Sequence, residues 1–167
     1  MVFREVMRPD GVAHPHAIAV DASDGVTLIA RTIEPPASGY PDVDRVIPRP
    51  ETHRAAIRVN GAAVCAALDR VMVLGSRRYA RAVAIDGGVG GHLRLRSTAA
   101  DQGIAEVTLP AEWPAEAVEF GVNGPYLKWI LGRCGGAVTL HQVDANAALT
   151  IRDDDETMTR LLMPMRV

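Results

Sequence analysis

The sequence is poor in the features that mark several classes of protein. Aromatic side chains make up only 4% of the 167 residues, which leaves few rings on which nucleic-acid bases could stack. The formal net charge is only −2, which excludes the strong overall attraction to phosphate of histone-like or tail-driven nucleic-acid binders. Of the 18 basic residues, Lys128 is the single lysine and all the others are arginines. We attribute this preference for arginine over lysine first to coding bias and second to phosphate chemistry.

Long apolar runs are also missing. No run approaches the roughly 20 residues that a membrane-spanning helix needs, and residues 1–5 lack the basic-then-apolar order of a secretory signal. The two cysteines, Cys65 and Cys134, lie within apolar helical patterns and form no Cys-x-x-Cys pair. We therefore expect buried, reduced thiols in a cytoplasmic protein.

Turn-forming residues, by contrast, are abundant. The chain contains 15 glycines and 11 prolines, which indicates many turns and favours a β-rich fold over a helix bundle. Because 48% of the residues are apolar, a chain of this length can bury a real core. We expect one domain with an additional arm.

Two segments of the sequence look alike at an offset of 63 residues, from Asn60 to Asn123. Each is a short β-type run that ends in Val-Asn-Gly and leads into a helical pattern, at 62–74 and at 125–134. Both asparagines are good N-caps, because an Asn side chain accepts a hydrogen bond from an otherwise unpaired helix N–H. Each pattern then meets a glycine that can take the left-handed conformation ending a helix, and these glycines are Gly75 and Gly135.

Three strand-like runs follow each helical pattern. They are 79–85, 92–96 and 104–109 after the first, and 137–143, 147–151 and 160–165 after the second. The sequence therefore predicts a βαβββ unit repeated twice, which is an α+β fold with two helices on one side of the sheets. Residues 87–91, which are rich in glycine, read as a hairpin tip. A phosphate-binding loop is the alternative, but the Lys-Ser/Thr pair and the following helix that it needs are absent.

The first fifty residues differ from the repeat. Residues 16–20 and 26–33 read as two strands joined by a turn, and prolines then impose an extended stretch. Two strands alone are marginally stable in water, so we expect this arm to pack on the domain or on another chain. The predicted organisation is an arm at 1–39, a linker at 40–51 and a domain at 52–167.

We find no catalytic constellation. His14 and His16 flank a proline and could offer two imidazoles to a metal, and residues 153–156 are acidic enough to attract a hard cation. A surface loop is the favoured interpretation for both, because no cysteine is near the histidines and the acids lack alternating ligand spacing. No serine lies in a Gly-x-Ser-x-Gly setting. We expect no cofactor, no metal and no enzymatic activity.

Positive charge gathers in one stretch. Residues 70–96 contain six arginines and one acid, a local charge of +5. A solvated basic face is one interpretation, and a weak, salt-sensitive contact with a phosphate backbone is the other. The candidate DNA-facing residues are Arg70, Arg77, Arg78 and Arg81.

The last seven residues form an apolar segment in which two methionines bracket a proline, Met163-Pro164-Met165. A strand that closes the core is the simpler interpretation. Methionine also provides a soft, adaptable surface for apolar peptides.

These last residues, Met163-Pro164-Met165-Arg166-Val167, resemble the C-terminal signature of bacterial sliding clamps, the β subunit of DNA polymerase III. Residues 40–48 resemble the linker into the clamp's third domain, and Phe120-Gly121-Val122-Asn123 with Tyr126-Leu127 resembles the start of that domain's second helix. The βαβββ repeat is the family's domain plan. The resemblance covers about residues 16–167, the third domain with the end of the second.

In that family, six such domains form a ring around duplex DNA with helices lining the hole, and polymerases and repair proteins dock short apolar peptides between the second and third domains. The resemblance therefore implies a peptide-binding pocket. Its residues would be Pro41, Arg45, Val46, Tyr79, Asn123, Tyr126, Asn146, Ala148, Leu162, Met163, Pro164, Met165 and Arg166. It also places Val73 and Leu74 near the seam between chains. A family chain carries three domains, so we do not expect a ring of two such short chains, although six copies could close one.

Three functions follow as hypotheses. The leading one is a non-catalytic, clamp-like protein of DNA replication or repair, a processivity factor that docks peptides of polymerases or repair proteins. The second is a homo-oligomer that encircles or touches duplex DNA, which the basic stretch motivates. The third is a stand-alone interaction domain that oligomerises through its apolar arm and does not encircle DNA.

Overall fold

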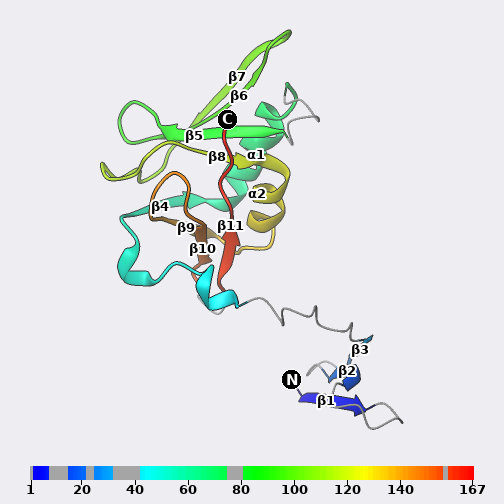
Figure 1. Ribbon diagram of the computed structural model, residues 1–167. Coiled ribbons are helices and arrows are strands. Elements are labelled where there is room, and N and C mark those ends of the chain that lie inside the picture. The colour runs from blue at the N-terminus through cyan, green and yellow to red at the C-terminus, as the bar shows by residue number, and fades with distance from the viewer. Residues whose placement is uncertain (1, 8–14, 22–24, 32–41, 75–80, 156–157) are drawn as a thin grey trace. The chain divides into compact units, whose positions relative to one another are not determined.

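The computed structural model describes residues 2–7, 15–21, 25–31, 42–74, 81–155 and 158–167 (Figure 1). The chain divides into two compact units, Met1–Asp42 and Val43–Val167. Each unit has its own sheet structure, so they are described separately.

The first unit is a three-stranded antiparallel sheet of β1 (Val2–Met7), β2 (Pro15–Asp21) and β3 (Thr27–Arg31), with β2 in the middle. The two expected strands correspond to β2 and β3. Sequence analysis missed β1, because its apolar residues come in pairs rather than in alternation. At the β2–β3 turn, the Thr27 hydroxyl donates to Asp21 Oδ1 at 2.7 Å. The proline-rich stretch 34–41 lies outside the described residues.

The second unit contains the predicted βαβββ order twice. The first copy is β4 (Ala55–Asn60), α1 (Gly61–Val71), β5 (Ala82–Gly87), β6 (Leu93–Ala99) and β7 (Gly103–Leu109). The second copy is β8 (Phe120–Asn123), α2 (Gly124–Leu131), β9 (Ala137–Gln142), β10 (Leu149–Asp153) and β11 (Arg160–Leu162). Two short 3-10 helices, Val43–Arg45 and Pro50–Thr52, precede them. The repeat and the α+β class are confirmed.

The two copies exchange their first strands. One sheet has the order β11-β10-β9-β4 and the other β7-β6-β5-β8, so each copy contributes an edge strand to the other copy's sheet. The two exchanges are equivalent, since Asn60 pairs with Ala137 and Asn123 pairs with Ala82. Neither copy can complete its sheet alone, and the repeats fold as one interlocked domain.

Both helices begin where the caps predict. Asn60 Oδ1 accepts from the Ala63 N–H at 2.9 Å, and Asn123 Oδ1 accepts from the Tyr126 N–H at 3.0 Å. The helices pack against one another, and Figure 1 shows them on a common side of the sheets. Space is tight at Gly124, where a Cβ would lie 2.6 Å from Met72 Sδ and 3.0 Å from the Arg81 carbonyl oxygen.

The predicted helix ends are wrong. The C-caps are Met72 and Gly132, both right-handed, and Gly75 lies outside the described residues. Gly135 is not left-handed, whereas Gly136 has a φ of +64°. Gly136 takes this conformation directly before β9, where its carbonyl accepts the N–H of the first α1 residue, Gly61, at 3.3 Å.

The glycine-rich segment is a hairpin tip, as expected. It joins β5 to β6, and Gly90 and Gly91 both have positive φ values. The Gly88 N–H donates to the His92 carbonyl at 2.7 Å. The segment leads into a strand rather than a helix, so the phosphate-loop alternative lacks the helix N-terminus that it requires.

The core lies between the two sheets and the two helices. Its members come from both sheets and both helices, so it is one contiguous cluster rather than two halves. The largest side chains with less than 2% exposure are Ile57, Leu68, Ile85, Leu93, Leu95, Leu127, Leu131, Leu140, Leu149 and Ile151. None of the helices in the described ranges is long and apolar enough to cross a membrane.

Candidate functional site

The segment 163–167, here named the tail, runs from one sheet to the other. It leaves β11 at the edge of the first sheet and reaches β8 of the second (Figure 1). There the Met165 N–H donates to the Gly121 carbonyl at 2.9 Å, and the two residues form an isolated antiparallel bridge. The strand expected at 160–165 is therefore shorter than predicted, because the chain leaves the first sheet after Leu162.

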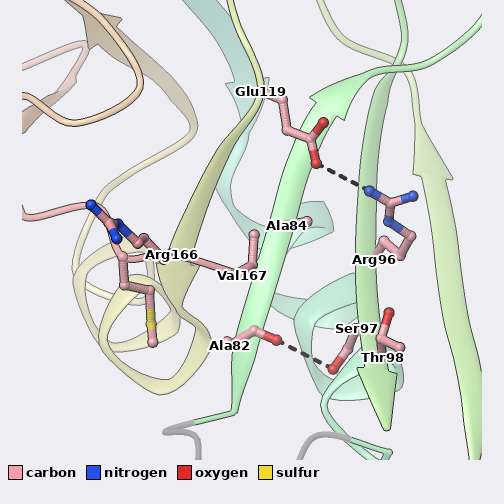
Figure 2. A pocket seen from close by; sticks show the side chains of 9 residues that line it. Ala82, Ala84, Arg96, Ser97, Thr98, Glu119, Arg166 and Val167 are labelled. Atoms are coloured by element: carbon pink, nitrogen blue, oxygen red, sulfur yellow. Dashed lines mark hydrogen bonds and ion pairs between the residues drawn. The ribbon is translucent and has the colours of Figure 1, made fainter. Parts of the chain in front are cut away.

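A pocket of about 490 Å³ lies between the tail and the sheet formed by β5 and β6 (Figure 2). The small side chains of Ala82 and Ala84 line its floor and leave room above the strand, and Ala84 pairs with Arg96 across the two strands. The complete lining consists of Ala82, Ala84, Arg96, Ser97, Thr98, Glu119, Met165, Arg166 and Val167.

The polar groups around the pocket are largely engaged with one another. Arg96 Nη2 lies 3.0 Å from Glu119 Oε1, and the buried Ser97 hydroxyl donates to the Ala82 carbonyl at 3.3 Å. Figure 2 shows the Arg166 side chain directed away from β5. An apolar floor with a few polar groups at its rim is suited to an apolar side chain whose orientation those groups fix.

The structure brings two of the predicted peptide-binding residues, Met165 and Arg166, into this pocket. The other tail residues lie elsewhere. Met163 is 59% exposed, Pro164 is half-buried, and Leu162 belongs to the core with 6% exposure.

Four more of the predicted residues lie at the start of α2 and at the end of the first 3-10 helix. Asn123 caps α2, and Tyr126 is 64% exposed in its first turn. Arg45 ends a 3-10 helix, and Val46 after it is 52% exposed. None of these four lines the pocket between the tail and β5.

The loop before β10 carries two more of the predicted residues. Asn146 is exposed, and its N–H donates to Asp144 Oδ1 at 2.7 Å, whereas Ala148 is buried. This bond, with a second from the Ala147 N–H, holds the pKa of the Asp144 carboxyl below its ordinary value. Pro41 and Tyr79 lie outside the described residues.

Sequence reasoning missed the β5 and β6 side of the pocket. A signal was present, because β5 alternates Ala82 and Ala84 with Val83 and Ile85. Such alternation shows that the first half of the strand carries only small side chains on one face. What the pattern did not show is that the tail would cross that face.

The predicted DNA-facing residues have different surroundings. Arg70 is exposed in the last turn of α1, beside Asp69, which forms an ion pair with Lys128 at 2.6 Å. Arg81 directly precedes β5, and Arg77 and Arg78 lie outside the described residues. The candidate seam residues follow α1: Val73 is 77% exposed and Leu74 is half-buried.

The cysteines are half-buried rather than fully buried as expected. Burial raises the pKa of the Cys65 thiol and of the Cys134 thiol, so both favour the protonated, less nucleophilic form. Of the acidic residues 153–156, Asp153 lies 3.2 Å from Arg160 and Asp154 lies 3.4 Å from Arg58. Within the described ranges, no group of three or more His, Cys, Asp or Glu residues is placed to hold a metal ion.

Comparison with known proteins gives a consistent result for the fold. No family model matches the chain, and no curated protein matches it. Solved structures do match: the DNA polymerase III subunit β sliding clamp of Bartonella birtlesii is 30% identical with a TM-score of 0.76, over 91% of this chain and 42% of the clamp. The Pseudomonas aeruginosa sliding clamp is 23% identical with a TM-score of 0.77, over 92% of this chain and 41% of the clamp.

A third match is a Bartonella birtlesii clamp bound to griselimycin, 29% identical with a TM-score of 0.76, over 92% of this chain and 40% of the clamp. The chain thus spans about two fifths of the clamps that it matches. The predicted resemblance to DNA polymerase III β sliding clamps is confirmed, and the chain has a clamp-like fold.

Proposed function

We propose that this protein is a clamp-like docking protein of DNA replication or repair, which binds short apolar peptides of polymerases or repair proteins at its tail. The observation that carries the proposal is the tail itself. Its methionine-bearing segment crosses between two sheets and walls a pocket with an apolar floor. The proposal assigns the protein no catalytic step.

Two further observations support peptide docking. A similar clamp is known bound to griselimycin, a peptide-like ligand. In this chain, exposed Tyr126 lies on α2 and exposed Met163 directly follows β11, and α2 contacts β11. Large exposed apolar side chains near a pocket are typical of docking surfaces, because their burial supplies much of the binding free energy.

A binding titration tests the proposal. A fluorescently labelled clamp-docking peptide from a bacterial replicative polymerase is titrated with the protein, and griselimycin is added as a competitor. We expect saturable binding that Met165→Ala weakens about tenfold, which corresponds to about 1.4 kcal/mol. Met158→Ala is the matched control, because Met158 is 57% exposed but lies before β11 and outside the pocket. No binding at high micromolar protein, or equal effects of both substitutions, contradicts the proposal.

A second candidate is contact with duplex DNA by a homo-oligomer, and exposed Arg70 on α1 favours it. Val73, at 77% exposure directly after that helix, is a candidate contact between copies. Arginine contacts to phosphate weaken as salt rises, because bound counterions are released. Light scattering measures the mass of the protein in solution. A mobility-shift assay with duplex DNA at low and high salt measures its binding to DNA. A monomer that ignores DNA at low salt contradicts this candidate.

The alternative is an interaction domain that oligomerises through its arm without encircling DNA. The arm's β3 strand is exposed along its whole length, with Leu28 at 62% and Ile29 at 69% exposure. Replacing both residues with serine would then convert an oligomer into a monomer in light scattering. A mass that does not change excludes the arm as the contact.

A further inference from the structure

We propose that Gly121 is the positioning residue of the tail: its missing side chain lets Met165–Val167 lie on β8 and so creates the pocket wall. The inference deepens the proposed docking function and rests on it for its biological meaning. The geometry that carries it does not depend on any ligand.

The tail approaches Gly121 more closely than a side chain would allow. A Cβ built on Gly121 would overlap the Met165 carbonyl oxygen and would lie 2.5 Å from Val167 Cγ1. The first of these atoms belongs to the backbone, so a rotamer change cannot relieve the contact. Any other residue at position 121 would have to move the tail or β8.

Backbone conformation does not explain this glycine. The glycines with positive φ in the described ranges are Gly25, Gly90, Gly91, Gly103 and Gly136, and Gly121 is not among them. Alanine could adopt its conformation, and glycine weakens a strand because it loses more conformational freedom on folding. A strand glycine of this kind marks a place where another backbone approaches closely.

The attachment of the tail is correspondingly slight. Among the described backbone hydrogen bonds, a single one joins the tail to β8, from the Met165 N–H to the Gly121 carbonyl. β8 itself is held from its other side by β5, where Gly121 pairs with Ala84. A displacement at Gly121 therefore moves the weakly held tail rather than the strand, and Met165, Arg166 and Val167 leave the pocket together.

Amide hydrogen exchange of the full chain tests this placement without a ligand. In Gly121→Ala, we expect the Met165 amide to lose protection about tenfold or more, while the amide of Leu140 in the core strand β9 keeps it. Gly135→Ala is the matched control, since a Cβ there meets nothing within 4 Å and its φ is not positive. Unchanged protection of Met165 in Gly121→Ala overturns the inference.

If Gly121→Ala does not fold, a second variant tests the placement of the tail on β8. Met165→Pro removes the N–H that donates to Gly121 and places the proline ring against the Gly121 carbonyl, while the residues of β8 stay unchanged. In the wild-type chain, we expect a nuclear Overhauser contact between the Val167 methyl groups and the Gly121 α-proton, and we expect Met165→Pro to abolish it. Absence of the contact in the wild-type chain, or its persistence in Met165→Pro, overturns the inference.

The peptide titration separates this inference from the proposed function. Loss of Met165 protection in Gly121→Ala, in a chain whose wild type binds no peptide, refutes docking but supports the role of Gly121. Peptide binding by the wild type that Gly121→Ala weakens about as much as Met165→Ala supports both. Binding that Gly121→Ala leaves unchanged, with Met165 still protected, refutes the role of Gly121 alone.

Discussion

Arg81 offers the sharpest test of how the repeat is built, because it holds a strained position. Its φ is +48°, and it is the single residue other than glycine with a positive φ in the described ranges. The equivalent position of the second copy is Gly136, with a φ of +64°. Each residue directly precedes a strand, and its carbonyl accepts the N–H of the other copy's first helical residue, Gly124 or Gly61, at 3.3 Å.

The comparison of Arg81 with Gly136 gives the expected change in the free energy of unfolding. A left-handed conformation costs a residue with a Cβ roughly 1–2 kcal/mol. Glycine avoids that cost but loses about 0.5–1 kcal/mol through the greater freedom of its unfolded chain. We therefore expect Arg81→Gly to raise the free energy of unfolding by about 0.5–1 kcal/mol. For a domain of this size, the melting temperature should rise by roughly 1–4 °C.

Urea unfolding monitored by circular dichroism measures the effect, and Arg81→Ala is its control. Alanine removes the arginine side chain but keeps the Cβ, so it should retain the strain and gain nothing. Arg81→Gly should therefore be more stable than Arg81→Ala by about 0.5–1 kcal/mol. If the two variants are equally stable, or if Arg81→Gly is the weaker, the assignment of backbone strain to Arg81 is refuted.

Three further predictions concern the caps, a histidine and the core. Asn60→Ala and Asn123→Ala should each destabilise the fold by about 1 kcal/mol in urea unfolding, because each leaves a helix N–H unpaired, and no loss would contradict the capping role. Burial, and then the charge of Arg152, hold the pKa of His53 below its ordinary value of 6.5, so its neutral form stabilises the folded state. The melting temperature should therefore fall as pH drops through and below about 6.5, and less steeply in His53→Gln, whereas parallel curves would exclude His53 as the cause. Leu140→Ala should cost about 2–5 kcal/mol, because Leu140 is fully buried, and a loss below about 1 kcal/mol would mean that the cavity collapses.

Local features of the sequence predicted the repeat and its elements well. The Val-Asn-Gly segments place both N-caps, because capping depends on a side chain and a backbone group three residues apart. The alternation of apolar and polar residues in 92–96 predicts β6 and is also a local pattern, since neighbouring residues of a strand face opposite sides. Pairwise apolar residues in β1 lack this regularity, so that strand was missed.

The candidate site was less predictable. Met165 and Arg166 could be named from the tail's resemblance, but Ala82, Ala84 and Glu119 could not. These residues lie far from the tail in the chain, and they become neighbours only because β8 of one copy joins the sheet of the other.

The sequence by itself determined the apolar periodicity and the N-caps, because each depends on residues within a few positions of one another. It also carried the resemblance to sliding clamps through short motifs. The tertiary structure decided the strand exchange, the left-handed backbone of Arg81 and the path of the tail over Gly121. These features depend on which distant backbones share a sheet, and no local pattern of side chains specifies that choice.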